Sequence, residues 1–156
     1  MESIEHSKNI LKGNSTGLTK QKVFISGSKT ISKLNDEFCK LLSEAVQASS
    51  EILIGDCNGV DALVQRYLAN LNYKNVTIYC SGQKPRNYID KSWKIHSCAE
   101  LAMGLKGRQF YTVKDIEMSK DCDYGIALWD SKSVGTAENI KRLKDLGKNA
   151  FVINIQ

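Results

Sequence analysis

The sequence predicts an α/β fold: a single Rossmann-like domain with a mainly parallel, five-stranded sheet and helices on both faces. Short apolar runs alternate with segments whose apolar residues recur at helical spacing. Several of these runs end at a glycine, where a strand can turn into the next element. A chain of 156 residues also suits one domain with a buried core. Alternation of strands and helices favours right-handed βαβ units and therefore a parallel sheet.

The first half of the chain contains two predicted strands and two predicted helices. Residues 1–20 are polar and without clear periodicity, which predicts a flexible N-terminal tail before a domain at 21–156. The elements that follow are a strand at 22–26, a helix whose apolar face runs over 34–46, a strand at 51–54 and a helix over 60–71. The last of these has the most regular helical spacing in the chain.

The second half is more irregular between residues 82 and 111, which contain the only proline, Pro85. The predicted elements are a strand at 75–79, a helix around 91–101, a short helix at 113–120, a strand at 124–129, a helix at 137–146 and a strand at 150–153. Gly147 follows the last helix, where glycine can adopt the left-handed cap.

Composition indicates an ordinary soluble protein, with 42% hydrophobic and 25% charged residues. No run of about 18 apolar residues is present, and the first residues lack the basic start and apolar stretch of a secretion signal. We therefore expect a cytoplasmic protein without membrane contact. The five cysteines are odd in number and contain no C-x-x-C pair, which argues against a disulfide framework and a zinc ribbon.

The net charge of +5 is concentrated in one segment. Residues 82–111 contain six basic and two acidic residues, a net +4. Such a segment can attract phosphates or nucleic acid, or it can be a solvated surface.

The predicted binding site lies at the carboxyl ends of the strands, where open parallel sheets bind ligands. Small polar residues and glycine follow three strands, in the loops 26–29, 55–61 and 131–136. Two of these loops lead into helices, whose N-termini suit a phosphate. The predicted ligand- or phosphate-binding residues are Ser26, Gly27, Ser28, Gly55, Asp56, Asn58, Gly59, Asp61, Arg86, Ser133, Gly135 and Thr136. The spacing fits neither the Walker A motif nor the G-x-G-x-x-G dinucleotide fingerprint.

Three aspartates lie near this predicted site and have alternative roles. Asp56, Asp61 and Asp115 could hold ribose hydroxyls, or a magnesium ion beside a phosphate. Asp56 and Asp61 also flank a helix start, where aspartate is favoured as a cap. No metal site formed by the protein alone is predicted, because His96 and Cys98 form an isolated pair.

Other side chains also have both a functional and a structural interpretation. Arg86 and Arg108 could clamp a phosphate or form surface ion pairs. Trp93 and Trp129 could stack on a base or pack in the core, with Trp93 on an amphipathic helix. Cys57 could be a reactive thiolate at a helix start, although no second cysteine or histidine is near it in the sequence.

Three motifs together resemble the SLOG superfamily, which joins DprA-like and LOG-like Rossmannoid proteins. They are Gly55-Asp56-Cys57-Asn58-Gly59-Val60-Asp61, Lys114-Asp115-x-x-Met118 and Trp129-Asp130-Ser131-Lys132-Ser133-Val134-Gly135-Thr136. Pro85-Arg86-Asn87 and Trp93 are similar to a feature of the small stand-alone members related to YspA and YpsA. The resemblance covers residues 22–155 and implies a nucleotide or nucleotide-derived ligand. It also leaves a homodimer open.

Some SLOG relatives cleave the N-glycosidic bond of nucleoside monophosphates with an arginine and a glutamate. The matching positions here are Lys114 and Asn139. Lysine lacks the planar fork of arginine, and asparagine cannot act as a carboxylate base. Glu138 is adjacent, but one step along a helix rotates it by about 100°. Catalytic residues are thus unassigned, with Asp115, Lys114 and Glu138 as candidates.

The sequence therefore predicts a nucleotide-binding sensor or carrier. One alternative is a LOG-like nucleoside or nucleotide N-glycosidase with reassigned carboxylates. Another is DprA-like binding of single-stranded DNA through residues 82–111. The aromatic residues are few and not interleaved with the basic ones, as binding of single strands usually requires.

Overall fold

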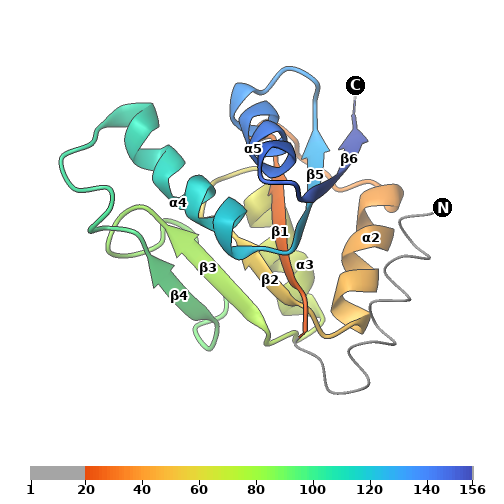
Figure 1. The fold of residues 1–156 in the computed structure, drawn as a ribbon. Helices are drawn as coiled ribbons and strands as arrows, with labels where there is room; N and C mark the ends of the chain where they lie inside the picture. Colours follow the sequence, from red (N-terminus) through yellow and green to blue (C-terminus); the bar gives the residue numbers. More distant parts are fainter. Residues whose placement is uncertain (1–19, 156) are drawn as a thin grey trace.

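The computed structural model describes residues 20–155 of the chain, and within them it has six strands and four helices (Figure 1). The predicted tail at 1–20 lies outside the described residues, apart from Lys20. The strands are β1 (Lys22–Gly27), β2 (Glu51–Ile54), β3 (Val76–Cys80), β4 (Lys94–Ser97), β5 (Tyr124–Trp129) and β6 (Asn149–Asn154). The helices are α2 (Asp36–Gln47), α3 (Val60–Asn70), α4 (Gly107–Asp121) and α5 (Val134–Asp145).

All strand pairs of the sheet are parallel, in the order β4-β3-β2-β1-β5-β6. The chain builds outward from β1 to β4, then crosses back to add β5 on the other side of β1 and β6 beyond it. The direction of winding thus reverses between β1 and β5. In this class of sheet, the carboxyl ends of the strands on either side of such a switch point border the ligand crevice.

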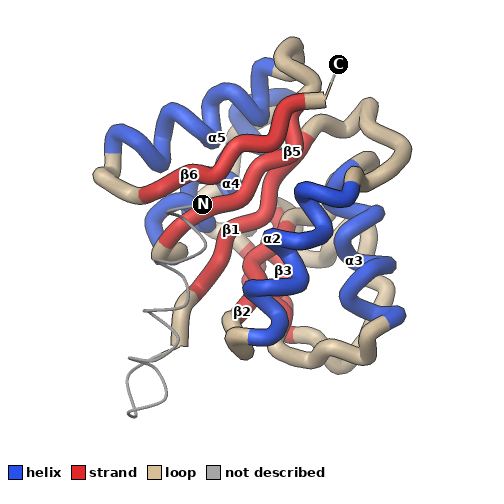
Figure 2. The backbone as a smooth tube through the Cα atoms, turned by 90° about the vertical axis from the view of Figure 1, so that its right-hand side faces the viewer, coloured by secondary structure: helices blue, strands red, loops and turns tan. Residues whose placement is uncertain are grey.

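The helices cover both faces of the sheet, which confirms the predicted α/β architecture (Figure 2). On one face, apolar residues of α2 and α3 such as Phe38, Leu42 and Val64 share one core cluster with residues of β1, β2, β3 and β5. On the other face, Val113 and Met118 of α4 and Leu143 of α5 pack against alternate strand residues. Successive residues of β1 point to opposite faces, and all of Val23, Phe24 and Ile25 are buried, as expected for a parallel sheet covered twice.

The helix predicted around 91–101 is wrong, and so is the count of five strands. Residues 94–97 form β4, an edge strand paired with β3, and all four of its side chains are exposed. An exposed edge strand has no alternation of buried residues, so periodicity gives no signal for it. Trp93 is buried just before this strand rather than on a helix, and its indole N–H donates to the Tyr73 carbonyl at 2.8 Å. The packing interpretation of Trp93 is therefore correct.

Two helices begin earlier than predicted. α4 begins at Gly107 rather than residue 113, and α5 begins at Val134 rather than residue 137. Their first turns are mostly exposed or polar, so an apolar face does not mark them. Among residues 20–155, none of the helices is long and apolar enough to cross a membrane.

Candidate functional site

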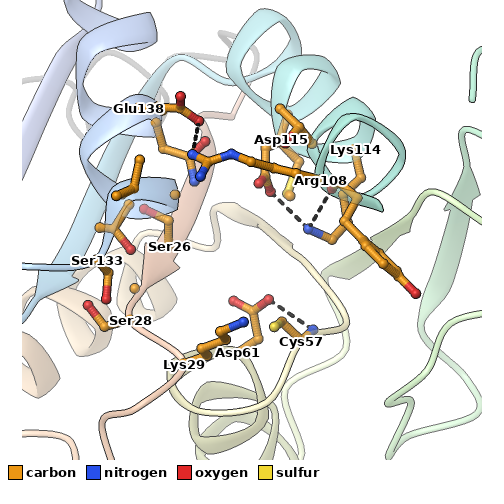
Figure 3. A pocket seen from close by; sticks show the side chains of 18 of the residues that line it. Ser26, Ser28, Lys29, Cys57, Asp61, Arg108, Lys114, Asp115, Ser133 and Glu138 are labelled. Carbon is orange, nitrogen blue, oxygen red and sulfur yellow. Dashed lines mark hydrogen bonds and ion pairs between the residues drawn. The ribbon is translucent and has the colours of Figure 1, made fainter. Parts of the chain in front are cut away.

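A cleft of about 700 Å³ opens at the carboxyl ends of β1 and β5, at the switch point of the sheet (Figure 3). Its walls come from the loop after β1, the start of α3, the first turns of α4 and the first turns of α5. This position agrees with the sheet edge predicted from the sequence. Clefts of this size hold ligands of nucleotide size.

The loop after β1 forms one side of the cleft with Ser26, Gly27, Ser28, Lys29 and Thr30. The backbone packs closely here, because a Cβ on Gly27 would lie 2.5 Å from the Val60 side chain. The Ser28 hydroxyl accepts a hydrogen bond from the Asp130 amide at 3.1 Å, and the Ser28 carbonyl accepts one from the Val60 amide at 3.4 Å. These contacts fix the loop against both β5 and α3.

The loop after β2 contributes only Cys57 and Asp61 to the lining of the cleft. The predicted residues Gly55, Asp56, Asn58 and Gly59 do not line it. Gly59 has a φ of +75° and packs on the backbone of Lys29. Gly59 thus supports the β1 loop, while Cys57 and Asp61 of the same motif reach the cleft.

Asp56 holds the Pro85–Asn87 turn in place. Its buried carboxylate accepts from the backbone amide and from the guanidinium of Arg86, both at 2.8 Å. The Asn87 side-chain amide donates to the carbonyls of Asp56 and Cys57 at 2.9 and 3.2 Å. With both carboxylate oxygens occupied, Asp56 acts in this structure as an anchor for Arg86, which itself lines the cleft.

The first turn of α5 forms the side of the cleft opposite Lys114 (Figure 3). The Asp130 carboxylate accepts from the amides of Lys132 and Ser133 at 2.9 and 2.7 Å. Within the described part of the chain, the next three amides, those of residues 134–136, have no recorded acceptor. A Cβ on Gly135 would meet no atom within 4 Å, so the backbone here borders open space. Free amides at the positive end of a helix are suited to an anion.

Three buried polar side chains line the cleft with unused hydrogen-bonding capacity. Ser26, Thr136 and Asn139 are only 6%, 4% and 5% exposed. Among residues 20–155, neither the Ser26 nor the Thr136 hydroxyl has a recorded partner, and Asn139 uses only its oxygen, which accepts from Arg142 at 2.6 Å. Buried polar groups are nearly always hydrogen-bonded, so these groups are available to a polar ligand.

Lys114 lies on the far side of the cleft between two carboxylates. Its side chain is only 6% exposed, and its ammonium donates to Asp115 at 3.1 Å and to the Tyr111 carbonyl at 3.3 Å. The Asp61 carboxylate and the Lys114 side chain both lie next to Gly55. A Cβ on that glycine would lie 2.7 Å from the Asp61 carboxylate and 3.3 Å from Lys114 Cε. Burial lowers the pKa of Lys114, but Asp115 and Asp61 outweigh it and the net pKa is raised.

Asp61 is a buried carboxyl whose ionisation is opposed by desolvation. Burial raises its pKa to about 7, although the Lys114 charge and the Cys57 amide, which donates to it at 3.1 Å, both favour the ionised form. The negative charges of Asp115 and Asp56 add to the increase. A carboxyl that titrates near neutral pH is a feature of many binding and catalytic sites.

Substitution of Asp61 by asparagine is expected to change the pH dependence of stability. Between about pH 4 and pH 7 the folded protein keeps a proton on Asp61 that the unfolded chain releases, so this group lowers the free energy of unfolding as the pH rises. The Asp61→Asn variant should therefore gain stability relative to the wild type between pH 5 and pH 8. Urea unfolding at both pH values measures this, with the exposed Asp145→Asn as control. If the difference in unfolding free energy between wild type and Asp61→Asn is the same at pH 5 and pH 8, the raised pKa of Asp61 is contradicted.

Arg108 and Glu138 join α4 to α5 across the cleft, as Figure 3 shows. The guanidinium donates to the Glu138 carboxylate at 2.7 Å and holds the pKa of that carboxyl below its usual value. Glu138 was expected to point away from the site because Asn139 is one step along the helix. Instead, both residues line the cleft, since the cleft spans a wide sector of the first turns of α5.

The remaining candidates have structural positions. The Trp129 indole donates to the Ser133 carbonyl at 2.9 Å and so fixes the loop before α5. His96 stacks on Tyr79 at the exposed sheet edge, with ring centroids 4.4 Å apart. Within residues 20–155 no three His, Cys, Asp or Glu side chains lie close enough to hold a metal ion.

Sequence reasoning named Arg108, Lys114 and Asp115 of α4 but missed two other residues of this helix that line the cleft, Tyr111 and Thr112. Tyr111 precedes Lys114 by three residues, which is one helical turn. The helix was predicted to begin at residue 113, so this pairing was not visible. An earlier helix start would have placed the two residues on one face.

No protein-family model matches this sequence, and no curated protein is significantly similar to it. The likeness to the SLOG superfamily therefore stays a prediction from the motifs.

Proposed function

We propose that the cleft binds a nucleotide or a nucleotide-derived phosphorylated ligand and that the protein is a ligand sensor or carrier. One observation supports this most strongly: the amides of residues 134–136 and the buried hydroxyls of Ser26 and Thr136 line the same cleft, and none of them has a hydrogen-bond partner among residues 20–155. Together these donors form a compact set that suits a phosphate group. These donors come from two of the three predicted loops, those after β1 and β5.

The charges around the cleft favour a small anion over a long polyanion. Four basic residues (Lys29, Arg86, Arg108, Lys114) and three acidic residues (Asp61, Asp115, Glu138) line it. The formal sum is only +1, so the dipole and amides of α5 carry much of the attraction. Asp61 or Asp115 can accept hydrogen bonds from ribose hydroxyls, and a magnesium ion can accompany a phosphorylated ligand.

Binding has more support than the two alternatives. At the positions expected for LOG-type catalysis, Lys114 is held by Asp115 and Asn139 is neutral. In the basic segment proposed for DNA, Arg86 and Arg108 are paired with Asp56 and Glu138. Five free thiols within the described residues suit a reducing, cytoplasmic setting for this function.

Thermal unfolding with a panel of ligands tests the proposal. The panel contains AMP, ADP, NAD, ADP-ribose, ribose 5-phosphate, adenosine and short single-stranded DNA. A phosphorylated compound at 100 times its Kd should stabilise the fold by about 2.7 kcal/mol, and adenosine should do less because it lacks the phosphate. Equal shifts with AMP and adenosine, or a shift with DNA alone, would contradict it. Assay of the same mixtures for free adenine tests for N-glycosidase activity.

A further inference from the structure

Tyr111 is an exposed aromatic side chain at the cleft. It lies on α4, is 44% exposed and lines the cleft. The guanidinium carbon of Arg86 lies 4.4 Å from the centroid of its ring, which is a cation–π contact. Because Arg86 covers one face of the ring, the exposed surface of Tyr111 belongs to the opposite face and the edges.

Two contacts hold the ring and a third fixes its backbone. Arg86 is fixed by its two hydrogen bonds to the buried Asp56, so the cation cannot move away from the ring freely. Phe110 packs edge-on against Tyr111, with centroids 5.0 Å apart. The Tyr111 carbonyl accepts from the buried Lys114 ammonium, which fixes this turn of α4. A ring fixed before binding loses little entropy when a planar group stacks on it.

The ring and the first turn of α5 belong to opposite sides of the cleft. Figure 3 shows Ser133 on one side and Lys114, one turn after Tyr111, on the other. Between them lie the carboxyl groups of Asp61 and Asp115. A ligand that spans the cleft thus meets free amides at one end, carboxylates in the middle and an aromatic surface at the other end.

Resting on the proposed function, we infer that Tyr111, backed by Arg86, is the platform on which the nucleobase stacks, so that the ligand class is a nucleoside 5′-phosphate rather than a sugar phosphate. Its phosphate lies at the first turn of α5, and its ribose lies beside Asp61 and Asp115. Every base presents a flat π surface, so stacking discriminates only weakly between bases. The platform thus selects for the presence of a base, with purines bound more tightly because of their larger surface.

Calorimetric titration of AMP and ribose 5-phosphate into three proteins tests this inference. The proteins are the wild type, Tyr111→Phe, which keeps the ring, and Tyr111→Leu, which removes it. The wild type and Tyr111→Phe should bind AMP about 10- to 100-fold more tightly than ribose 5-phosphate. In Tyr111→Leu the affinity for AMP should fall to that for ribose 5-phosphate, which should be the same in all three. Tyr111→Phe should keep the stability of the wild type, and Tyr111→Leu should lose only what the half-exposed ring gains from Arg86 and Phe110; thermal unfolding checks that both variants stay folded.

The outcomes separate this inference from the proposed function. If AMP binds the wild type and Tyr111→Leu equally, the base does not stack on Tyr111, while the proposed function stands. If Tyr111→Leu weakens ribose 5-phosphate as much as AMP, Tyr111 does not act through the base and the inference is overturned. If neither AMP nor ribose 5-phosphate binds the wild type, both the stacking of a base on Tyr111 and the proposal of a nucleotide ligand are wrong.

Discussion

Replacement of Gly59 by alanine is expected to destabilise the fold by about 3–5 kcal/mol. Gly59 is the N-cap of α3 and has φ +75° and ψ −128°, a conformation that only glycine adopts readily. A Cβ there would also collide with the backbone atoms of Lys29. The strain and the collision both arise where the β1 loop crosses the start of α3. Neither backbone can move there without loss of packing.

Urea unfolding of Gly59→Ala measures this loss, and Gly135→Ala is the matched control. Gly135 lies in the first turn of α5, and an added Cβ meets no atom within 4 Å. Alanine there should leave the stability unchanged or raise it by up to about 1 kcal/mol, because alanine is the better helix former. Equal stability of the two variants would contradict the close approach of Gly59 to Lys29. Variants of Gly59 consequently report on the fold and cannot isolate a role in binding.

Replacement of Gly135 by leucine is expected to abolish ligand binding while the protein stays folded. The side chain enters the open space beside the free amides of residues 134–136 and occupies the volume assigned to the phosphate. We expect the affinity for AMP to fall by about 100-fold or more, which corresponds to the loss of several charge-assisted hydrogen bonds. Calorimetric titration measures this effect.

The matched control for this variant is Lys141→Leu. It adds the same side chain to the same helix at a position that is exposed and does not line the cleft. Its affinity for AMP should equal that of the wild type. Wild-type binding by Gly135→Leu, with unfolding curves that show all three proteins folded, would exclude the first turn of α5 as the phosphate site.

The fold could be predicted from the sequence where side chains alternate between buried and exposed environments or are buried throughout. The run 23–25 is apolar because β1 is covered on both faces, and the spacing of Val60, Val64 and Leu68 reflects one buried face of α3. β4 could not be predicted, because an exposed edge strand is stabilised by backbone hydrogen bonds to β3 and leaves no apolar pattern. The strand order depends on packing between distant segments and is also absent from local patterns.

The candidate site was predictable to the extent that it depends on topology. Glycine and small polar residues after β1 and β5 indicated the edge of the sheet at which the cleft opens, because parallel strands all end there. The individual role of Asp56 was not predictable, since it depends on a hydrogen bond to Arg86, thirty residues away. The contribution of Tyr111 was missed for a related reason: nothing local shows that α4 begins at Gly107 and brings this ring to the cleft.

The most direct test of the account is to follow the backbone amide resonances of residues 133–136 by NMR during titration with AMP and, separately, with adenosine. If the first turn of α5 holds the phosphate, AMP should shift the amides of Val134, Gly135 and Thr136 strongly, and adenosine should leave them nearly unchanged. The amides of Ser26 and Ser28 should follow the same pattern more weakly. AMP binding that leaves these amides unmoved, or that shifts them no more than adenosine does, would contradict the central claim.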